Sequence, residues 1–163
     1  MIDVRIRPAQ PGDEHVIVDL VRELAEYERA ADQAIATPDL FRIALFSDHP
    51  SVFAHIAETT SGEVAGFCLW FLNFSTWQGK HGIYLEDLYV RPHFRGHGIG
   101  QALMAELARI CTEQGYPRFE WWVLDWNESA REVYRHIGAE DLSEWIPYRV
   151  SGTALHELAR KAQ

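Results

Sequence analysis

Three alternating glycines mark a place where an apolar strand pattern gives way to an apolar helix pattern. Gly96, Gly98 and Gly100 follow a run of β-branched and aromatic residues that ends at Val90, and a helical pattern begins near Ile99. Without side chains, main-chain N–H groups in such a turn can approach an anion closely, and the positive end of the helix dipole lies at the same place. The segment therefore predicts a strand–loop–helix unit suited to a phosphate or pyrophosphate.

Two common phosphate-binding motifs do not fit this spacing. A dinucleotide fingerprint needs a glycine where Gln101 stands, and a phosphate loop needs GK[ST] after four intervening residues. Arg91 and Arg95 lie beside the glycines and are of the type that donates charge-assisted hydrogen bonds to phosphate. Taken alone, the segment is equally compatible with a glycine-rich turn that binds no ligand.

Length and composition favour a single domain over residues 1–163. The chain is 47% hydrophobic and 12% aromatic, which is ample for a packed core. Its net charge of −9 opposes nucleic-acid binding. The start lacks a signal-peptide pattern and no run of about 18 apolar residues occurs, so we expect a cytoplasmic protein without a membrane segment. Two cysteines outside any CxxC pair suggest neither disulfides nor a cysteine zinc site.

Periodicity along the chain predicts strands and helices in a definite order. Helices are expected at residues 16–28, 38–46, 99–115 and 129–138, with a helical tail after the last strand. Strands are expected at residues 4–6, 52–58, 64–72, 83–90, 119–124 and 145–150. The three consecutive middle strands should be antiparallel, and the strand–helix–strand unit after them is most simply a parallel crossover. The result is a mixed sheet.

The segment R95-G-H-G98-I-G100 matches the Q/R-x-x-G-x-G/A signature of the GNAT acyltransferases. RELAEYE at 22 to 28, YLEDLYV at 84 to 90, DWNESAREVYRHIGAEDL at 125 to 142 and the element order resemble the spermidine/spermine and thialysine N-acetyltransferase branch. This resemblance covers nearly the whole chain. It implies an α/β (α+β) GNAT fold, with a single mixed, mostly antiparallel sheet of about six to seven strands flanked by helices on both faces.

The resemblance also implies a binding site for acetyl-CoA as co-substrate. Main-chain groups of the strand before the glycines would pair with the pantetheine arm, at Leu88, Tyr89 and Val90. The loop would hold the pyrophosphate through Arg95, Gly96, His97, Gly98, Ile99, Gly100 and Gln101. The start of the following helix would flank the thioester end, at Asn127, Glu128, Ser129 and Ala130.

Amide formation needs a neutral amine, although an alkylammonium has a pKa of about 10.4, so a base or a proton-accepting water is required. By resemblance Glu86 faces the amine, either as that base acting through water or as an anchor for the cation. Asp87 beside it has a weaker case, since a structural hydrogen bond explains it equally well. Tyr27 and Glu28 end the first helix where this branch contacts its amine.

Departure of a thiolate is helped by an acid, and a tyrosine with a pKa of about 10 can donate that proton. Tyr134 occupies the position where the family keeps this acid; by pattern alone it reads as a core tyrosine on an apolar stripe. His93 and His97 fall in a loop without a carboxylate close in sequence, so we expect no metal.

The leading interpretation is an enzyme that transfers an acetyl group directly to a small cationic amine, such as a polyamine, a diamine or thialysine. An alternative keeps the acetyltransferase but changes the acceptor to an amino acid, an antibiotic amine or a protein N-terminus. A different class, a non-catalytic acyl-CoA-binding module, also remains. By resemblance the protein is expected to form a homodimer.

Overall fold

The computed structural model describes residues 3–162, and the chain forms two compact units, Met1–Trp122 and Val123–Gln163. The first unit contains a five-stranded sheet, three α-helices and two short 3-10 turns, Ala31–Gln33 and Pro92–Phe94. Its strands are β1 Val4–Pro8, β2 Phe53–Thr59, β3 Val64–Ser75, β4 Lys80–Val90 and β5 Phe119–Trp121. Its helices are α1 Glu14–Tyr27, α2 Pro38–Phe46 and α3 Ile99–Gln114.

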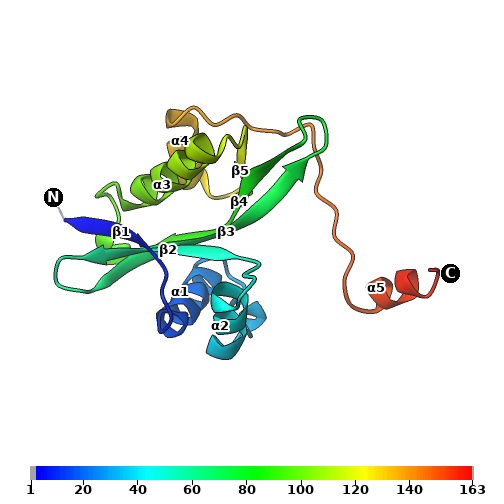
Figure 1. Ribbon diagram of the computed structural model, residues 1–163, viewed down its shortest axis with the longest axis horizontal. Helices are drawn as coiled ribbons and strands as arrows, with labels where there is room; N and C mark the ends of the chain where they lie inside the picture. Colours follow the sequence, from blue (N-terminus) through cyan, green and yellow to red (C-terminus); the bar gives the residue numbers. More distant parts are fainter. Residues whose placement is uncertain (1–2, 163) are drawn as a thin grey trace. The chain divides into compact units, whose positions relative to one another are not determined.

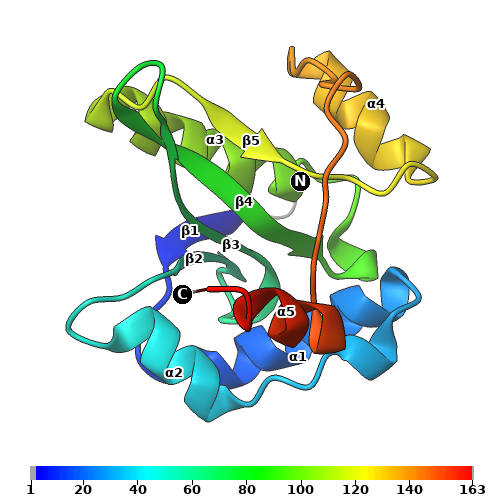
Figure 2. The same ribbon diagram turned by 90° about the vertical axis from the view of Figure 1, so that its right-hand side faces the viewer.

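The strands of the first unit lie in the order β1-β2-β3-β4-β5. The first three pairings are antiparallel, and β5 lies parallel to β4 after the connection through α3. Figure 1 shows α1 and α2 on one face of this sheet and α3 on the other. Figure 2 shows β5 beside β4 at the end of the sheet. A mixed sheet with helices on both faces is what the sequence predicts.

The core of the first unit follows from an amphipathic helix lying on a strand surface. In α1, Ile17 and Leu20 recur at helical spacing and are fully buried. They pack in one cluster with Ile56 of β2 and Phe67 of β3. Because successive strand residues point to opposite faces, the neighbours of these strand residues can be buried under α3 as well. The central strands are therefore apolar on both faces.

A pair of ionic contacts fixes the entry into α1. Arg7 of β1 donates to both carboxylate oxygens of Asp13, at 2.7 and 3.1 Å, and to Glu58 of β2, at 3.2 and 3.3 Å. A guanidinium suits such forked contacts because its donors lie in one plane. These contacts hold the start of α1 against the first two strands.

The second unit contains α4 Glu128–His136 and α5 Gly152–Ala159. Asn127 caps α4 as the sequence predicts, since its side-chain oxygen accepts from the N–H of Ala130. Gly138 follows the helix in the left-handed conformation, with φ of 85°. Its N–H donates to the carbonyl of Arg135, which satisfies a carbonyl of the last helical turn.

Most predicted elements are confirmed, and α2 has the predicted bounds. The predicted last strand at residues 145–150 is wrong, because this segment pairs with no strand, so the described sheet has five strands rather than six to seven. Strand β5 also ends at Trp121 instead of residue 124. Apolar and β-branched residues only favour an extended chain, whereas a strand also needs an edge to pair with.

Candidate active site

Strand β4 carries one extra residue, Glu86, relative to its partner β3. Leu69 pairs with Asp87 and the next residue, Trp70, pairs with Leu85, so Glu86 is left over as a β-bulge. Simple alternation predicts that Leu85 and Asp87 share a face and that Glu86 faces the opposite way. The register instead places Leu85 and Asp87 on opposite faces, because their partners Trp70 and Leu69 are successive residues of β3.

The bulge coincides with the end of pairing between β4 and β5. The parallel ladder joins only Ile83, Tyr84 and Leu85 to β5, and it stops at the residue before Glu86. A bulge bends its strand and increases the local twist, which separates β4 from a straight neighbour. Among the described strands, β4 therefore has β3 on one side and no partner on the other from Glu86 to Val90.

The open edge of β4 presents particular main-chain groups. The N–H of Arg91 donates to the carbonyl of Ala65 at 2.9 Å, which makes this pair a hydrogen-bonded one. Since bonded and non-bonded pairs alternate in an antiparallel ladder, Tyr89 also bonds to β3, while Leu88 and Val90 direct their N–H and C=O groups to the open edge. Of the three residues predicted to pair with a pantetheine arm, Leu88 and Val90 therefore direct their main-chain groups away from β3, and the carbonyl of Val90 accepts from the side chain of Arg95.

The glycine loop supplies a series of unused donors. Gly96 and Gly98 both have φ of 78°, and Gly98 precedes the first residue of α3 without a capping side chain. Within residues 3–162, no main-chain N–H from Gly96 to Gln101 donates to a protein acceptor. A Cβ added at Gly96 or Gly98 would meet nothing within 4 Å. The loop thus offers free amides, open space and a helix dipole to an anion.

The two arginines beside the loop have different partners. Arg91 donates to both carboxylate oxygens of Glu23 in α1, with its shortest contact at 2.9 Å, and to the carbonyl of Val64. It is thus used to join the end of β4 to α1. Arg95 is exposed and donates from Nε to the carbonyl of Val90 at 2.8 Å. The guanidinium of Arg95 remains beside the loop, at its surface.

Carboxylates gather near the bulge. Glu86 is exposed, Asp87 is half-buried, and Glu28 caps the end of α1, directly after Tyr27. Burial, and then the neighbouring Glu86 and Glu28 carboxylates, raise the pKa of Asp87 to about 7. Burial also raises the pKa of Glu28. Such a group of acidic side chains is stabilised when a cation binds among them.

Asp87 is the residue to which sequence reasoning gave too little weight. Its face could not be assigned from alternation, because the bulge at Glu86 reverses it. The available signal was the adjacent pair of carboxylates inside an apolar strand, which is costly to bury without a partner. The structure brings Glu28, Glu86 and Asp87 close enough for the two glutamates to act on the pKa of Asp87.

The second unit carries the remaining predicted residues. Asn127, Glu128, Ser129 and Ala130 form the capped start of α4, where the hydroxyl of Ser129 also donates to Asn127 at 3.2 Å. Tyr134 lies one turn further along the helix and is half-buried. Its carbonyl accepts the N–H of Ala139, which closes the helix end.

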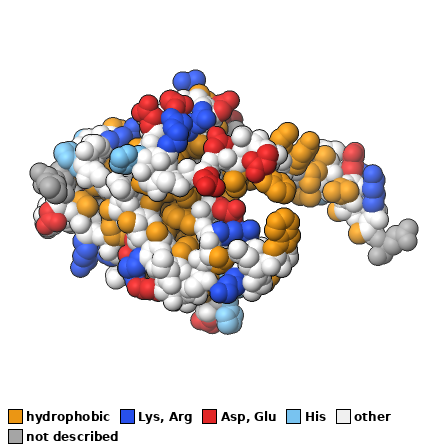
Figure 3. Space-filling view, turned by 90° about the horizontal axis from the view of Figure 1, so that it is seen from above, with side chains coloured by type: hydrophobic (Ala, Val, Ile, Leu, Met, Phe, Trp, Pro, Cys, Tyr) orange, Lys and Arg blue, Asp and Glu red, His pale blue; other side chains and the backbone are white. Residues whose placement is uncertain are grey.

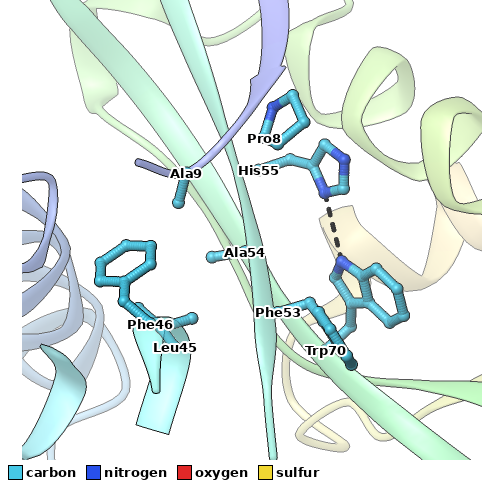
Figure 4. A pocket seen from close by; sticks show the side chains of 8 residues that line it. All are labelled: Pro8, Ala9, Leu45, Phe46, Phe53, Ala54, His55 and Trp70. Carbon is cyan, nitrogen blue, oxygen red and sulfur yellow. Dashed lines mark hydrogen bonds between the residues drawn. The ribbon is translucent and has the colours of Figure 1, made fainter. Parts of the chain in front are cut away.

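A cavity of about 160 Å³ lies elsewhere in the first unit and contains none of the predicted site residues. Figure 4 shows its mostly apolar lining, with His55 hydrogen-bonded to Trp70. The indole N–H of Trp70 donates to Nδ1 of His55 at 3.2 Å, and burial lowers the pKa of this histidine. His55 is therefore a neutral, satisfied core residue.

The surface charge of the described chain is mixed, and its metal-binding side chains are scattered. On the face shown in Figure 3, acidic and basic side chains are interspersed. Within residues 3–162 no group of three or more His, Cys, Asp or Glu side chains could hold a metal ion. None of the described helices combines the length and apolar character needed to cross a bilayer.

Comparison with known proteins agrees with this geometry. The model of the acetyltransferase (GNAT) family matches residues 17–139. A thialysine N-epsilon-acetyltransferase of Bos taurus is 40% identical over 171 residues, covering 99% of this chain and all of the relative. The human spermidine/spermine N(1)-acetyltransferase-like protein 1 is 32% identical over 95% of this chain, which matches 24% of that protein.

A solved structure has the same fold. An integron cassette protein from the mobile metagenome of V. cholerae superposes with a TM-score of 0.77 and 31% identity, over 99% of this chain and all of that one. The open β4 edge, the free loop amides and these matches define an acyl-transfer fold. The chain belongs to the acetyltransferase (GNAT) family and is an N-acetyltransferase.

We predict that the loop glycines differ in their tolerance of alanine. Gly98→Ala should lower the free energy of unfolding by about 1 kcal/mol, because its φ of 78° is unfavourable for any residue with a Cβ. Gly100→Ala should change it by less than about 0.5 kcal/mol, since the new Cβ would lie 3.8 Å from Val90 in ordinary contact. Urea unfolding of both variants tests this, and equal losses would contradict it.

We also predict a pH-dependent effect of Asp87→Asn. Asp87 has a pKa of about 7 when folded and 3.8 ordinarily, so the folded chain keeps a proton that the unfolded chain releases. The contribution of Asp87 to stability should therefore fall as the pH rises from about 4 to 7. The Asn variant should be more stable than wild type by about 2 kcal/mol at pH 8, after allowance for partial exposure, and nearly equal at pH 4.

Urea titrations at both pH values measure this difference. Asp48→Asn, at an exposed position after α2, is the matched control and should show no such pH dependence. A constant offset between wild type and Asp87→Asn at the two pH values would show that Asp87 ionises normally.

Proposed function

We propose that this N-acetyltransferase moves the acetyl group of acetyl-CoA to a primary amine of a small cationic substrate of the polyamine, diamine or thialysine type. The transfer is direct, within a ternary complex, without an acyl-enzyme. Both cysteines are buried, and burial raises the pKa of the Cys68 thiol to about 12, which disfavours either as a nucleophile. The single observation that carries the proposal is the uninterrupted series of unused amides from Gly96 to Gln101 beside an open strand edge.

The chain's own residues fit the two ends of the coenzyme. Amides of Gly96, His97, Gly98, Ile99, Gly100 and Gln101 would bind the pyrophosphate, with Arg95 beside them. The main-chain groups of Leu88 and Val90 would pair with the pantetheine amides as an added strand does. Asn127, Glu128, Ser129 and Ala130 would flank the thioester. Bound there, acetyl-CoA supplies an activated acyl carbon.

The carboxylates of Glu28, Glu86 and Asp87 would bind and deprotonate the amine. Glu28 and Glu86 would attract the ammonium form, and Tyr27 would form a wall of the same pocket. Before it can react, the amine must lose a proton, which Glu86 would accept through water. Asp87 is a second candidate for this role, because a carboxyl with a pKa of about 7 both accepts and releases protons near neutral pH. Tyr134 would protonate the departing thiolate.

The proposal extends to the domain organisation, the compartment and the oligomeric state of the protein. Residues 1–163 would act as one acetyltransferase domain, and the family model does extend across both compact units. The protein would work in the cytoplasm as a homodimer, without a metal. An acetyltransferase for another acceptor, such as an amino acid, an antibiotic amine or a protein N-terminus, is the second candidate. A non-catalytic acyl-CoA-binding module is a third.

We predict that a panel of amines separates these candidates. Purified protein with acetyl-CoA should release free thiol with diamines, spermidine or S-aminoethylcysteine at least tenfold faster than with aminoglycosides or peptide N-termini. Release is followed with a thiol reagent on protein-free filtrates, so that Cys68 and Cys111 do not contribute. Thiol release with none of the acceptors would leave only a binding module, and preference for a peptide would change the acceptor class.

We predict that Tyr134→Phe lowers kcat by about 10²-fold, since general acid–base catalysis commonly contributes factors of this size. The affinity for coenzyme A should change less than about twofold, because the ring is kept. Calorimetry with coenzyme A and initial rates with the best amine measure the two effects. Equal loss of both, or of neither, would remove the acid role from Tyr134.

A further inference from the structure

Within the first unit, Arg95 lies between the glycine loop and the end of α1. Its guanidinium carbon is 4.9 Å from the centroid of the Tyr27 ring and 5.5 Å from that of Tyr89. Both distances fall within the range of cation–π attraction. One side of this arginine therefore faces the end of α1, where the amine is expected, and its backbone begins the glycine loop.

The same side chain also contacts the open edge of β4, where the coenzyme is proposed to pair. Nε of Arg95 donates to the carbonyl of Val90 at 2.8 Å, and this carbonyl is one of the groups directed to the open side of β4. A pantetheine amide that paired with Val90 would compete for that carbonyl. A diphosphate on the amides of Gly96 to Gln101 would attract the exposed guanidinium from the adjacent position.

An ammonium substrate would compete with Arg95 for the face of the Tyr27 ring. The face of Tyr27 attracts cations, and the neighbouring carboxylate of Glu28 favours them as well. Two cations cannot share one ring face without repulsion. As long as the guanidinium stays over Tyr27, it excludes the amine from that face.

We infer that Arg95 is a positioning residue that fills the cation site on Tyr27 until coenzyme draws it away, and so weakens amine binding while the coenzyme is absent. This inference rests on the proposed function, because it takes Tyr27 as part of the amine pocket. By linkage, the coenzyme must raise amine affinity by the same factor by which the amine raises coenzyme affinity.

The neighbouring Arg91 shows why the role falls to Arg95. Arg91 is half-buried and held by Glu23 and the Val64 carbonyl, which fixes its guanidinium. Arg95 is exposed and has no carboxylate among its hydrogen-bond partners within residues 3–162. It can move at little cost, whereas Arg91 cannot.

The test measures binding without turnover, by titrating S-aminoethylcysteine or spermidine in the absence and presence of saturating coenzyme A, which carries no acetyl group. In wild type, coenzyme A should tighten amine binding roughly two- to fivefold, the size of an exposed cation–π contact. Arg95→Gln should bind the amine without coenzyme as tightly as wild type does with it. The ratio of amine affinity with coenzyme A to amine affinity without it should therefore be about 1 in this variant.

Matched variants separate the charge from the fold. Arg95→Lys keeps a cation at the ring and should retain most of the wild-type ratio. Arg109→Gln removes a surface arginine that pairs with Glu106 and Glu113 on α3, and it should behave as wild type. Tyr27→Leu removes the ring itself, so its ratio should also be about 1, with weaker amine binding.

Three results would overturn the inference: a ratio of 1 in wild type, weaker or unchanged amine binding to folded Arg95→Gln without coenzyme, or loss of the ratio in Arg95→Lys. A merely structural arginine gives the second result, because its removal loosens the site. Thermal unfolding of each variant establishes that it is folded. If wild type binds coenzyme A but shows no coupling, only this inference fails; if it does not bind coenzyme A, the proposed function fails.

Discussion

The extra residue at Glu86 is the feature on which the rest of the site depends. It ends the pairing of β4 with β5 after Leu85, and so leaves the main-chain groups of Leu88 and Val90 without a strand partner. It also reverses the faces of the strand, which brings Asp87 under the influence of Glu28. One insertion thus produces both an open strand edge and an acidic group beside it.

A second constraint keeps these two regions together. Glu23, on the last turns of α1, holds Arg91 at the end of β4 through both carboxylate oxygens. The partly buried pair joins the helix end that carries Tyr27 and Glu28 to the strand end that leads into the glycine loop. Arg95 then reaches from that loop to the ring of Tyr27. The regions proposed for the amine and for the coenzyme are therefore joined by direct contacts within the first unit.

Local sequence patterns predicted the glycine loop, the caps at Asn127 and Gly138, and the order of elements up to α4, because each rests on contacts within a few residues. The failures have another origin. The strand expected at residues 145–150 has suitable residues, including alternating apolar ones, but no ladder. Likewise, the half-buried Asp87 could not be placed from its own neighbours in sequence, since its face is set by the register against β3.

By itself, the sequence determined the family, through the R-x-x-G-x-G segment and its neighbours, and the backbone freedom that the loop requires. Only the tertiary structure decided which groups those elements present: that Val90 and Leu88 face an open edge, that Arg91 is bound internally while Arg95 is not, and that three carboxylates converge. The physical reason is that propensity and spacing act along the chain, whereas strand register and ion pairing act between segments far apart in it.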